Sequence, residues 1–385
     1  MNRRADPAPS APAEPPQLPG SLQTNRQLAQ WLRFLPDGSI EVRAGKVDIG
    51  QGISTALAQI AAEELDVGIE RIRMAGVSTA ASPNEAVTSS SLSIQNSGSA
   101  LRYACAEARA LYLAAAAARL GVPAASLSIA DGEIAGAGGK RTSYAELADD
   151  ALLAREATAS VAPKETTQHR IVGRSQARFD LPPKIFGEPR FVHDLELPGM
   201  LHARVLRPLS AAATLVSLDE ARARALPGVV AVVRDGSFVG VLAGREETAL
   251  AALELLRQGA AWQETETLPD AAALGEWLKQ QPADTRVIAE RGPGAAAGAA
   301  QTRRRRYTRP FIAHASIAPS CALAQWDEGR LRVWSHTQGI YNLRTDLALT
   351  LGLAANEIAV EHAEGAGCYG HNAADDVALL SLIHI

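Results

Sequence analysis

Polar and hydrophobic positions alternate over residues 39–44, which predicts a half-buried strand. Glycines at Gly50 and Gly52 interrupt the chain, and hydrophobic positions then return at helical spacing as far as Leu65. Ser54 stands at the start of this spacing and is a candidate N-cap, because its hydroxyl can accept a bond from a free N–H of the first turn. The pattern therefore predicts a strand, a glycine turn and a helix in succession.

The rest of the chain continues to mix strands and helices. An alanine-rich helix is expected over residues 99–120, since Gly121 and Pro123 provide a stop signal directly after it. The same patterns predict strands at 71–78, 200–206 and 358–360, hairpins about 131–132, 235–236 and 326–329, and helices at 246–258 and 342–351. This mixture predicts an α+β fold, and no internal repeat is visible in the sequence.

A chain of 385 residues is too long for one ordinary core, so we expect several domains. Residues 1–27 are rich in proline and are expected to form a disordered tail, because proline lacks a donor and resists helix formation. Linkers are expected at 151–168 and 292–300, where periodicity is weak. The predicted ordered segments are therefore 28–150, 170–265 and 300–385.

Composition and charge narrow the function. The formal net charge of -4 gives no reason to expect nucleic acid as a partner. The three cysteines share no close spacing, which disfavours a disulfide framework, a zinc site or an iron–sulfur site. No apolar run approaches the roughly 20 residues of a membrane span, and the proline-rich start lacks the apolar region of a signal peptide. We therefore expect a cytoplasmic protein without a membrane span.

The triplet Gly50-Gln51-Gly52 is weak evidence when it is taken alone. The simpler interpretation is a tight turn between a strand and a helix. The functional interpretation is an anion site, because glycine lets main-chain amides approach a phosphate and the following helix adds its positive end. The spacing fits neither a Walker loop nor the dinucleotide G-x-G-x-x-G pattern, so ordinary nucleotide binding is disfavoured.

Several longer blocks resemble, in order, the molybdopterin-binding large subunits of the xanthine dehydrogenase and aldehyde oxidase family. The resemblance lies in residues 46–65, 82–91, 172–262, 335–338 and 367–370. The third block resembles the a/b hammerhead domain of that family. Because the G-Q-G block comes before the hammerhead, the order is similar to the branch that contains isoquinoline 1-oxidoreductase and nicotinate dehydrogenase large subunits.

The resemblance implies molybdopterin-binding lobes around an a/b hammerhead domain at 170–265, with molybdenum held by a molybdopterin cytosine dinucleotide. The pterin and inorganic ligands would bind the metal, so no protein metal ligand is expected. Gln338 would donate from its amide to an oxygen ligand of molybdenum, and main-chain amides near Tyr369 and Gly370 would support the same oxygen. The expected cofactor-binding residues are Gly50, Gln51, Gly52, Thr88, Ser89, Ser90, Ser91, Gln338, Gly367, Cys368, Tyr369 and Gly370.

The implied reaction is hydroxylation of an N-heteroaromatic compound or an aldehyde with oxygen from water. Electrons would pass to a small subunit with two [2Fe-2S] clusters, and a cytochrome c subunit is a further acceptor that the family allows. Periplasmic location is likewise found in the family and is the alternative to a cytoplasmic one. The sequence does not identify the substrate.

The chain departs from the family at two places. The family's catalytic Glu lies in a Gly-Val-Gly-Glu-like segment that is absent here, so we expect that Glu beyond residue 385 and expect the chain to be truncated. A non-catalytic cofactor-binding scaffold or interaction module is therefore the alternative function. Relatives also place glycines where this chain has Ala86 and Ser89-Ser90. His371, Asp375 and Asp376 have the residue types of a metal site, but a loop and helix-start role is favoured.

Overall fold

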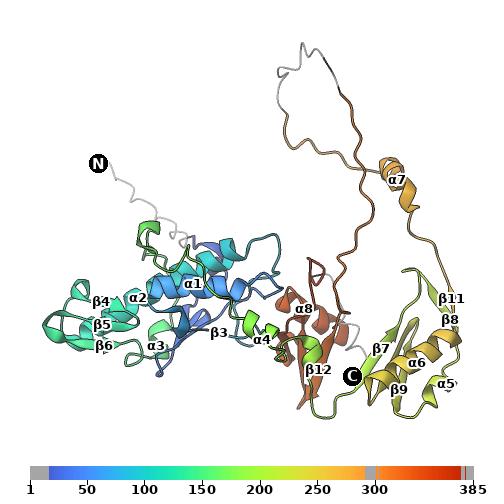
Figure 1. Ribbon diagram of the computed structural model, residues 1–385, viewed down its shortest axis with the longest axis horizontal. Coiled ribbons are helices and arrows are strands. Elements are labelled where there is room, and N and C mark those ends of the chain that lie inside the picture. Colours follow the sequence, from blue (N-terminus) through green and yellow to red (C-terminus); the bar gives the residue numbers. More distant parts are fainter. Residues whose placement is uncertain (1–16, 291–300, 302, 374–377, 379–385) are drawn as a thin grey trace, which may run out of the picture. The chain divides into compact units, whose positions relative to one another are not determined.

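The computed structural model describes residues 17–290, 301, 303–373 and 378, which form two compact units (Figure 1). The first comprises residues 1–197 and 316–385, and the second comprises residues 198–315. Both combine helices with small, mainly antiparallel sheets, which confirms the predicted α+β class. The linker predicted at 292–300 lies outside the described residues.

The first unit begins with a strand–strand–helix–strand motif. Strand β1 (Leu32–Phe34) pairs antiparallel with β2 (Ile40–Val42), and β3 (Ile72–Met74) pairs parallel with β2. Helix α1 (Ile53–Leu65) supplies the crossover that a parallel pair requires. Two of the strands were predicted with longer bounds, whereas the three-residue β1 was not predicted.

Helix α2 (Ser99–Leu120) has the predicted bounds and follows directly on a π-helix, Ile94–Gly98. Figure 1 shows α1 and α2 side by side. Both helices bury small side chains in the same hydrophobic core, and Ala58, Ala61 and Ala104 are fully buried. The core of this part of the chain therefore lies between the helix pair and the β1–β3 sheet.

A second small sheet follows α2. Strands β4 (Ser128–Ala130) and β5 (Glu133–Ala135) form the predicted hairpin about Asp131-Gly132. Strand β6 (Arg141–Ser143) pairs with β5 and was not predicted. Helix α3 (Asp150–Leu153) comes next, inside the segment that sequence patterns indicated as a linker.

Two segments expected to be unstructured are held on the first unit. Leu18 and Leu22 are buried, although they fall within the predicted tail at 1–27; residues 1–16 lie outside the described part. The predicted linker 151–168 is irregular but anchored, because the buried Glu107 accepts bonds from the main chain of Thr158 and Ala159. Buried acceptors therefore fix backbone that has little periodicity of its own.

A second motif of the same topology forms near the C-terminus. Strand β12 (Ala322–Asp327) pairs antiparallel with β13 (Arg330–Ser335), and β14 (Ile358–His362) pairs parallel with β13. Helix α8 (Ile340–Leu351) is the crossover. The predicted hairpin, helix and strand are all present. The structure thus contains two equivalent strand–strand–helix–strand motifs that no sequence repeat indicated.

The two motifs join edge to edge. The Thr79 N–H donates to the Val360 carbonyl at 2.9 Å, and the His362 N–H donates to the Val77 carbonyl at 2.9 Å. The Thr79 hydroxyl also accepts from the Val360 N–H at 3.0 Å. This antiparallel join brings the end of β14 beside the chain that leaves β3.

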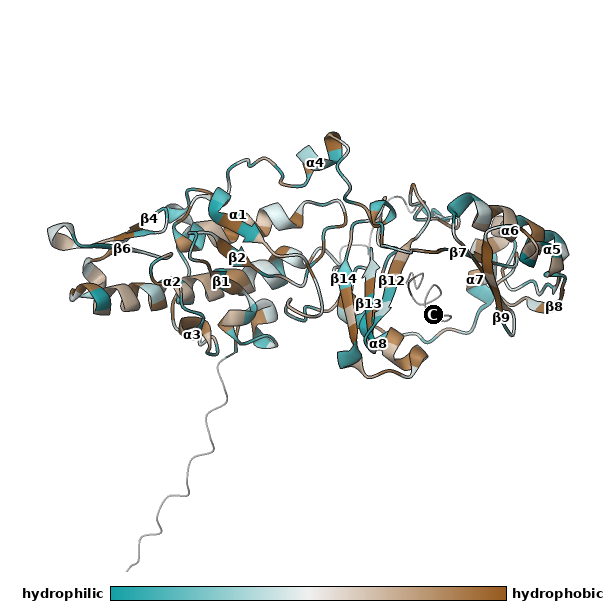
Figure 2. Cartoon of the chain, turned by 90° about the horizontal axis from the view of Figure 1, so that it is seen from below, coloured by the Kyte–Doolittle hydropathy of each residue, from teal (hydrophilic) through white to brown (hydrophobic). Residues whose placement is uncertain are grey.

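The second unit is a separate α+β module. Its first sheet has the order β7 (His202–Leu206), β10 (Phe238–Ala243) and β9 (Val229–Asp235), with α6 (Glu246–Gly259) packed on it. Strand β9 is largely hydrophobic in Figure 2. The other elements of this unit are β8 (Thr214–Leu218), α5 (Ala221–Arg224), β11 (Ala260–Gln263) and α7 (Leu274–Gln280).

The range 170–265 that resembles a hammerhead overlaps this second unit only from residue 198 onward. Residues 170–197, including helix α4 (Leu181–Ile185), belong to the first unit. Lys184 on α4 forms ion pairs with Asp180 and Glu364 there. Among the helices that the structure describes, none combines the length and apolar character needed to cross a bilayer.

Candidate functional site

The four loops predicted to bind a cofactor occupy equivalent places in the two motifs. Residues 50–52 lie between β2 and α1, and Gln338 lies between β13 and α8. Residues 88–91 follow β3, and residues 367–370 follow β14. Each loop therefore leaves the carboxyl end of a strand in a parallel pair, which is where open α/β sheets place ligands.

Thr88 and Gln338 connect the two motifs through buried hydrogen bonds. The Thr88 N–H donates to the Gln338 carbonyl at 2.8 Å, and Gln338 Nε2 donates to the Thr88 carbonyl at 2.7 Å. Thr88 Oγ1 also accepts from the Val47 N–H at 3.0 Å, and Gln338 Oε1 accepts from the Ala373 N–H at 2.9 Å. The chain just before the predicted loop 50–52 and the chain just after the predicted loop 367–370 are thereby linked to this pair.

His362 forms a second connection that sequence patterns did not indicate. Its Nε2 lies 2.8 Å from the Asp48 carbonyl, and its Nδ1 lies 3.1 Å from the Thr337 carbonyl. A neutral imidazole has one N–H and donates to only one of them. Burial lowers the pKa of His362, while the two carbonyls act in the opposite direction. The ring therefore ties the G-Q-G segment to the loop that carries Gln338.

The start of α1 differs from the prediction. Gly52, in the left-handed region at φ 74°, is the N-cap, and Ser54 is already the second helical residue. Asp48 provides the capping group instead: its Oδ1 accepts from the Ile53 N–H at 2.9 Å, and its Oδ2 accepts from the Ser54 hydroxyl. A carboxylate here also interacts favourably with the positive end of the helix. The N-cap rule failed because the acceptor lies outside the cap position.

The G-Q-G loop presents main-chain N–H groups. Gln51 folds back on the loop, accepting from the Ile49 N–H at 2.7 Å and donating to the Val47 carbonyl at 2.9 Å. Within the described part of the chain, the N–H groups of Gly50, Gln51 and Gly52 have no acceptor. A Cβ at Gly50 would meet nothing within 4 Å. The loop thus leaves open donors at the start of a 13-residue helix.

Residues 82–91, called the serine loop below, include backbone conformations that favour glycine. Ala86, Ser90 and Ser91 have φ values of 54°, 56° and 58°, in the left-handed region. Ala86 and Ser90 are among the positions at which the family resemblance predicts glycine. The loop therefore keeps a glycine-like path, at a conformational cost of about 1 kcal/mol or more at each such residue. Ser89, Ser90 and Ser91 are exposed.

Replacing Ala86 or Ser90 by glycine is expected to raise the free energy of unfolding by about 0.5–1 kcal/mol each, because glycine adopts positive φ without steric cost. Ala81→Gly is the matched control, since Ala81 lies in the same exposed segment without a positive φ. It is expected to lower stability through added chain entropy. Urea titration measures both. If Ala86→Gly lowered the free energy of unfolding as much as Ala81→Gly does, the inference that the backbone at Ala86 is strained would be wrong.

The last predicted loop is folded back by Asn372. Asn372 Nδ2 donates to the His336 carbonyl at 3.0 Å, and the Asn372 carbonyl accepts from the Gln338 N–H at 3.4 Å. Tyr369 and Gly370 both have positive φ, 52° and 87°. Their N–H groups have no acceptor among the described residues, and successive turns of this kind form an anion-binding concavity.

Other residues of this loop do not suggest a metal site. Cys368 is buried with a free thiol, and Gly367 has φ 115°, where a Cβ would lie 2.7 Å from the Tyr369 ring. Asp375 and Asp376 lie outside the described residues. In the part of the chain that the structure describes, no group of three or more His, Cys, Asp or Glu side chains could hold a metal ion.

These loops fit a cofactor that is anchored by hydrogen bonds and brings its own metal ligands. The donors are main-chain N–H groups in two separate loops, and Gln338 keeps one amide N–H without a described acceptor. Lys46 and Arg178 add positive charge nearby. Lys46 is buried, which lowers its pKa, and Arg178 donates to the Gly50 carbonyl at 3.1 Å.

Comparison with known proteins identifies the two regions of the chain that carry these loops. Residues 14–178 match a family described as molybdopterin cofactor-binding domain, and residues 280–383 match a second family of the same description. Together the matches span more than half of the chain and include all four loops. The chain contains molybdopterin cofactor-binding domains.

Two similar proteins have names that describe oxidoreductases. The chain is 41% identical to a nicotinate dehydrogenase subunit of Pseudomonas putida, over 91% of this chain and 30% of that protein. It is 30% identical to the beta subunit of isoquinoline 1-oxidoreductase from Brevundimonas diminuta, over 52% of this chain and 31% of that protein. The chain thus spans about a third of the length of these relatives.

A solved structure shows a partial likeness. Quinoline 2-oxidoreductase from Pseudomonas putida 86 is 22% identical, with a TM-score of 0.42. The match covers 52% of this chain and 31% of that chain. The family assignment rests on the sequence matches and not on this likeness.

Proposed function

We propose that this chain is the cofactor-binding part of a molybdenum hydroxylase that uses molybdopterin cytosine dinucleotide. Its substrates would be N-heteroaromatic compounds or aldehydes, as the names of the relatives suggest; these relatives also include an aldehyde oxidoreductase molybdenum-binding subunit of Escherichia coli, 26% identical over 50% of this chain. The observation that carries the proposal is the buried Thr88–Gln338 connection, which joins loops from both matched regions. When bound, the molybdenum cofactor supplies the two-electron chemistry that incorporates oxygen from water.

This chain's own residues would bind and orient the cofactor. The free N–H groups of residues 50–52 lie at the start of α1, where the helix end favours a phosphate. Residues 88–91 and 367–370 would contribute further main-chain and hydroxyl donors. Gln338 is fixed by Thr88 and Ala373, so its remaining amide N–H is held in a defined direction. No catalytic base is assigned among these residues.

The proposed partners follow from the relatives' names, which describe subunits of larger enzymes. We propose that a small [2Fe-2S] subunit accepts the electrons and that a cytochrome c subunit is a further acceptor. We also propose that residues 170–265 form the a/b hammerhead domain. Nucleic acid is not a proposed partner, because the chain carries a net negative charge.

Gln338→Leu is expected to lower the molybdenum content per chain about tenfold or more, since residues that position a metal group through hydrogen bonds commonly have effects of this size. The gene product is purified from a molybdate-supplied host, and metal is measured by mass spectrometry. Acid hydrolysis of the bound cofactor identifies the nucleotide, with cytidine monophosphate as the expected product.

Gln325→Leu is the matched control, because Gln325 is exposed on β12, outside the connected loops. It is expected to keep the molybdenum content. A folded protein that binds neither molybdenum nor pterin would contradict the proposal and favour the non-catalytic scaffold. If acid hydrolysis releases a nucleotide other than cytidine monophosphate, only the cytosine form of the cofactor is contradicted, and the proposal of a molybdenum cofactor stands.

A further inference from the structure

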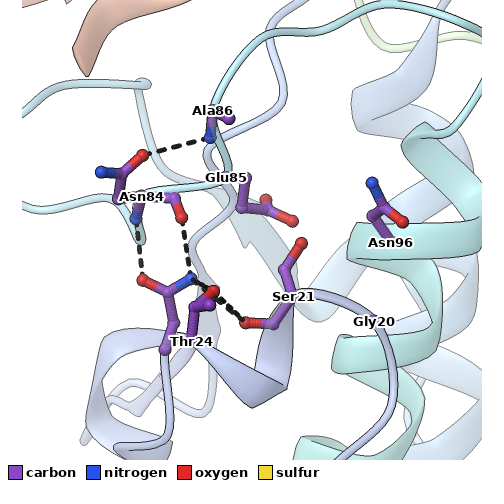
Figure 3. Close-up of a pocket in the computed structure, with 8 residues that line it drawn as sticks. Gly20, Ser21, Thr24, Asn84, Glu85, Ala86 and Asn96 are labelled. Atoms are coloured by element: carbon purple, nitrogen blue, oxygen red, sulfur yellow. Dashed lines mark hydrogen bonds between the residues drawn. The ribbon is translucent and has the colours of Figure 1, made fainter. Parts of the chain in front are cut away.

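A polar surface pocket of about 500 Å³ lies on the first unit, on segments to which no cofactor role has been given. It is drawn in Figure 3. Three stretches of chain enclose it: residues 20–25, residues 84–86 and the π-helix that carries Asn96. Its volume is within the range of small-molecule sites. The lining residues are Gly20, Ser21, Thr24, Asn25, Asn84, Glu85, Ala86 and Asn96.

Glu85 lines this pocket, and one of its carboxylate oxygens has no hydrogen-bond partner. The residue is 5% exposed, and its Oε2 accepts from the Gly45 N–H at 2.7 Å and from the Ser97 hydroxyl at 2.9 Å. Its Oε1 is buried and has no hydrogen-bond partner. Figure 3 shows the carboxylate pointing toward Ser21, with Asn96 on the opposite wall. A buried acceptor of this kind is costly unless a donor binds it.

The charges around Glu85 leave that oxygen available. Lys46 lies close, but its Nζ donates to the main-chain carbonyls of Glu85 and Val87, at 2.8 and 3.1 Å. Among the described residues, no Lys, Arg or His nitrogen lies within 4.0 Å of the Glu85 carboxylate. Among the residues that the structure describes, no cationic side chain lines the pocket, so an anionic ligand would meet only a carboxylate and neutral groups there.

The walls of the pocket are built by close backbone packing. A Cβ at Gly20 would lie 2.2 Å from the Asn96 carbonyl oxygen, so only glycine allows this approach to the π-helix. Asn25 fixes the opposite side: its Nδ2 donates to the Asn84 carbonyl at 2.9 Å, and its Oδ1 accepts from the Asn84 N–H at 2.9 Å. A π-helix turn of this kind is frequent at functional sites.

These contacts select the ligand chemistry. A guanidinium prefers both oxygens of a carboxylate, but Oε2 is already occupied by two donors. A calcium or magnesium ion needs several oxygen ligands, usually with more than one carboxylate, and the described lining residues include one carboxylate, that of Glu85. A primary ammonium group has one compact charge and three donors, which suits one free carboxylate oxygen with neutral acceptors around it.

We propose that this pocket binds a small primary ammonium compound, with Glu85 Oε1 as its anionic hydrogen-bond acceptor. The Asn96 and Asn84 amides and the Ser21 hydroxyl provide the polar surroundings for the rest of the molecule. Asn84, Glu85 and Ala86 precede the predicted cofactor residues 88–91 in the same loop, but none of the predicted cofactor-binding residues lines the pocket, so the proposal does not depend on the proposed function.

Ethanolammonium chloride is the probe, and its binding to the purified chain is measured by titration calorimetry at constant ionic strength. Tetramethylammonium chloride carries the same charge but no N–H donor. We expect saturable binding of the first, with one site per chain, and none of the second. Glu85→Gln is expected to weaken binding at least tenfold.

The glutamine of Glu85→Gln can still accept from Gly45 and Ser97 through its carbonyl, so the variant is expected to fold with an unchanged or higher thermal midpoint. Glu70→Gln is the control, because Glu70 is exposed and does not line the pocket. Asn96→Ala tests the opposite wall without removing any bond of Glu85, and is also expected to weaken binding. Equal binding to wild type and Glu85→Gln, equal binding of both cations, or no binding would each overturn the proposal.

Discussion

Replacement of Glu63 by alanine is expected to lower the free energy of unfolding of the first unit by about 3–5 kcal/mol, as for a broken buried ion pair. Glu63 lies on α1 and is 2% exposed. Its Oε2 accepts the N–H groups of Arg170, Ile171 and Val172 at 2.7, 2.6 and 3.1 Å. Its Oε1 lies 3.5 Å from Lys164 Nζ. Alanine leaves three donors and a lysine without this acceptor.

Urea titration followed by tryptophan fluorescence measures the change, and hydrogen exchange at residues 170–172 shows whether the segment detaches. Glu70→Ala is the control on the adjoining segment, because Glu70 is exposed, and a shift below about 0.5 kcal/mol is expected. An equally small change in the free energy of unfolding for Glu63→Ala would contradict this prediction. It would mean that water replaces the carboxylate as acceptor for the three N–H groups without loss of stability.

The contribution of Glu63 also depends on pH. Burial, the largest influence, raises its pKa, but the three N–H donors and Lys164 together outweigh it, so the pKa is lowered. A carboxyl whose folded pKa is lowered stabilises the fold above its unfolded pKa, near 4.3. That stability is lost as the pH falls through the folded pKa. The difference between wild type and Glu63→Gln should therefore be largest near neutral pH and shrink in acid.

Gly45→Ala is expected to lower the unfolding free energy by about 3 kcal/mol, at the upper end for overpacking. A Cβ at Gly45 would lie 2.2 Å from the Pro83 carbonyl oxygen and 3.1 Å from the Glu85 side chain. Backbone on both sides would have to separate, which also breaks the bond from the Gly45 N–H to Glu85. Because the displaced loop carries Thr88, molybdenum content should fall with stability.

Gly76→Ala is the matched control for Gly45→Ala. Gly76 follows β3, and a Cβ there would meet nothing within 4 Å. Urea titration and metal analysis of both variants measure the effects. If the two variants had nearly equal stability and molybdenum content, the prediction would be wrong. The loop that carries Pro83 would then move away from Gly45 without cost.

Local signals explain why some elements were predicted well. Helix α2 ends where expected, because Gly121 adopts φ 63° directly after Leu120 and Pro123 prevents continuation. The start of α1 was predicted less well, since Asp48 caps it from five positions before Ile53, beyond the reach of a cap rule. Strands of three residues, such as β1, are too short to show alternation.

Contacts between distant segments could not be derived from local patterns. The bond between Thr79 and Val360 spans 281 positions, and nothing in either segment indicates the other. Resemblance to a family placed residues 50–52, 88–91, Gln338 and 367–370 in one site, and the structure links segments of these loops. The roles of the individual residues in cofactor binding stay predictions. The equivalence of the two motifs emerged only from strand pairing.

The separation of Thr88 from Gln338, 250 positions, has a consequence for synthesis of the protein. At a translation rate of about 5–20 residues per second, Thr88 leaves the ribosome about 12–50 s before its partner. During that interval the chain after β3 has an unpaired edge, which can pair with other nascent chains. Chaperone supply and translation speed should therefore affect the yield of folded protein more than the stability of either motif does.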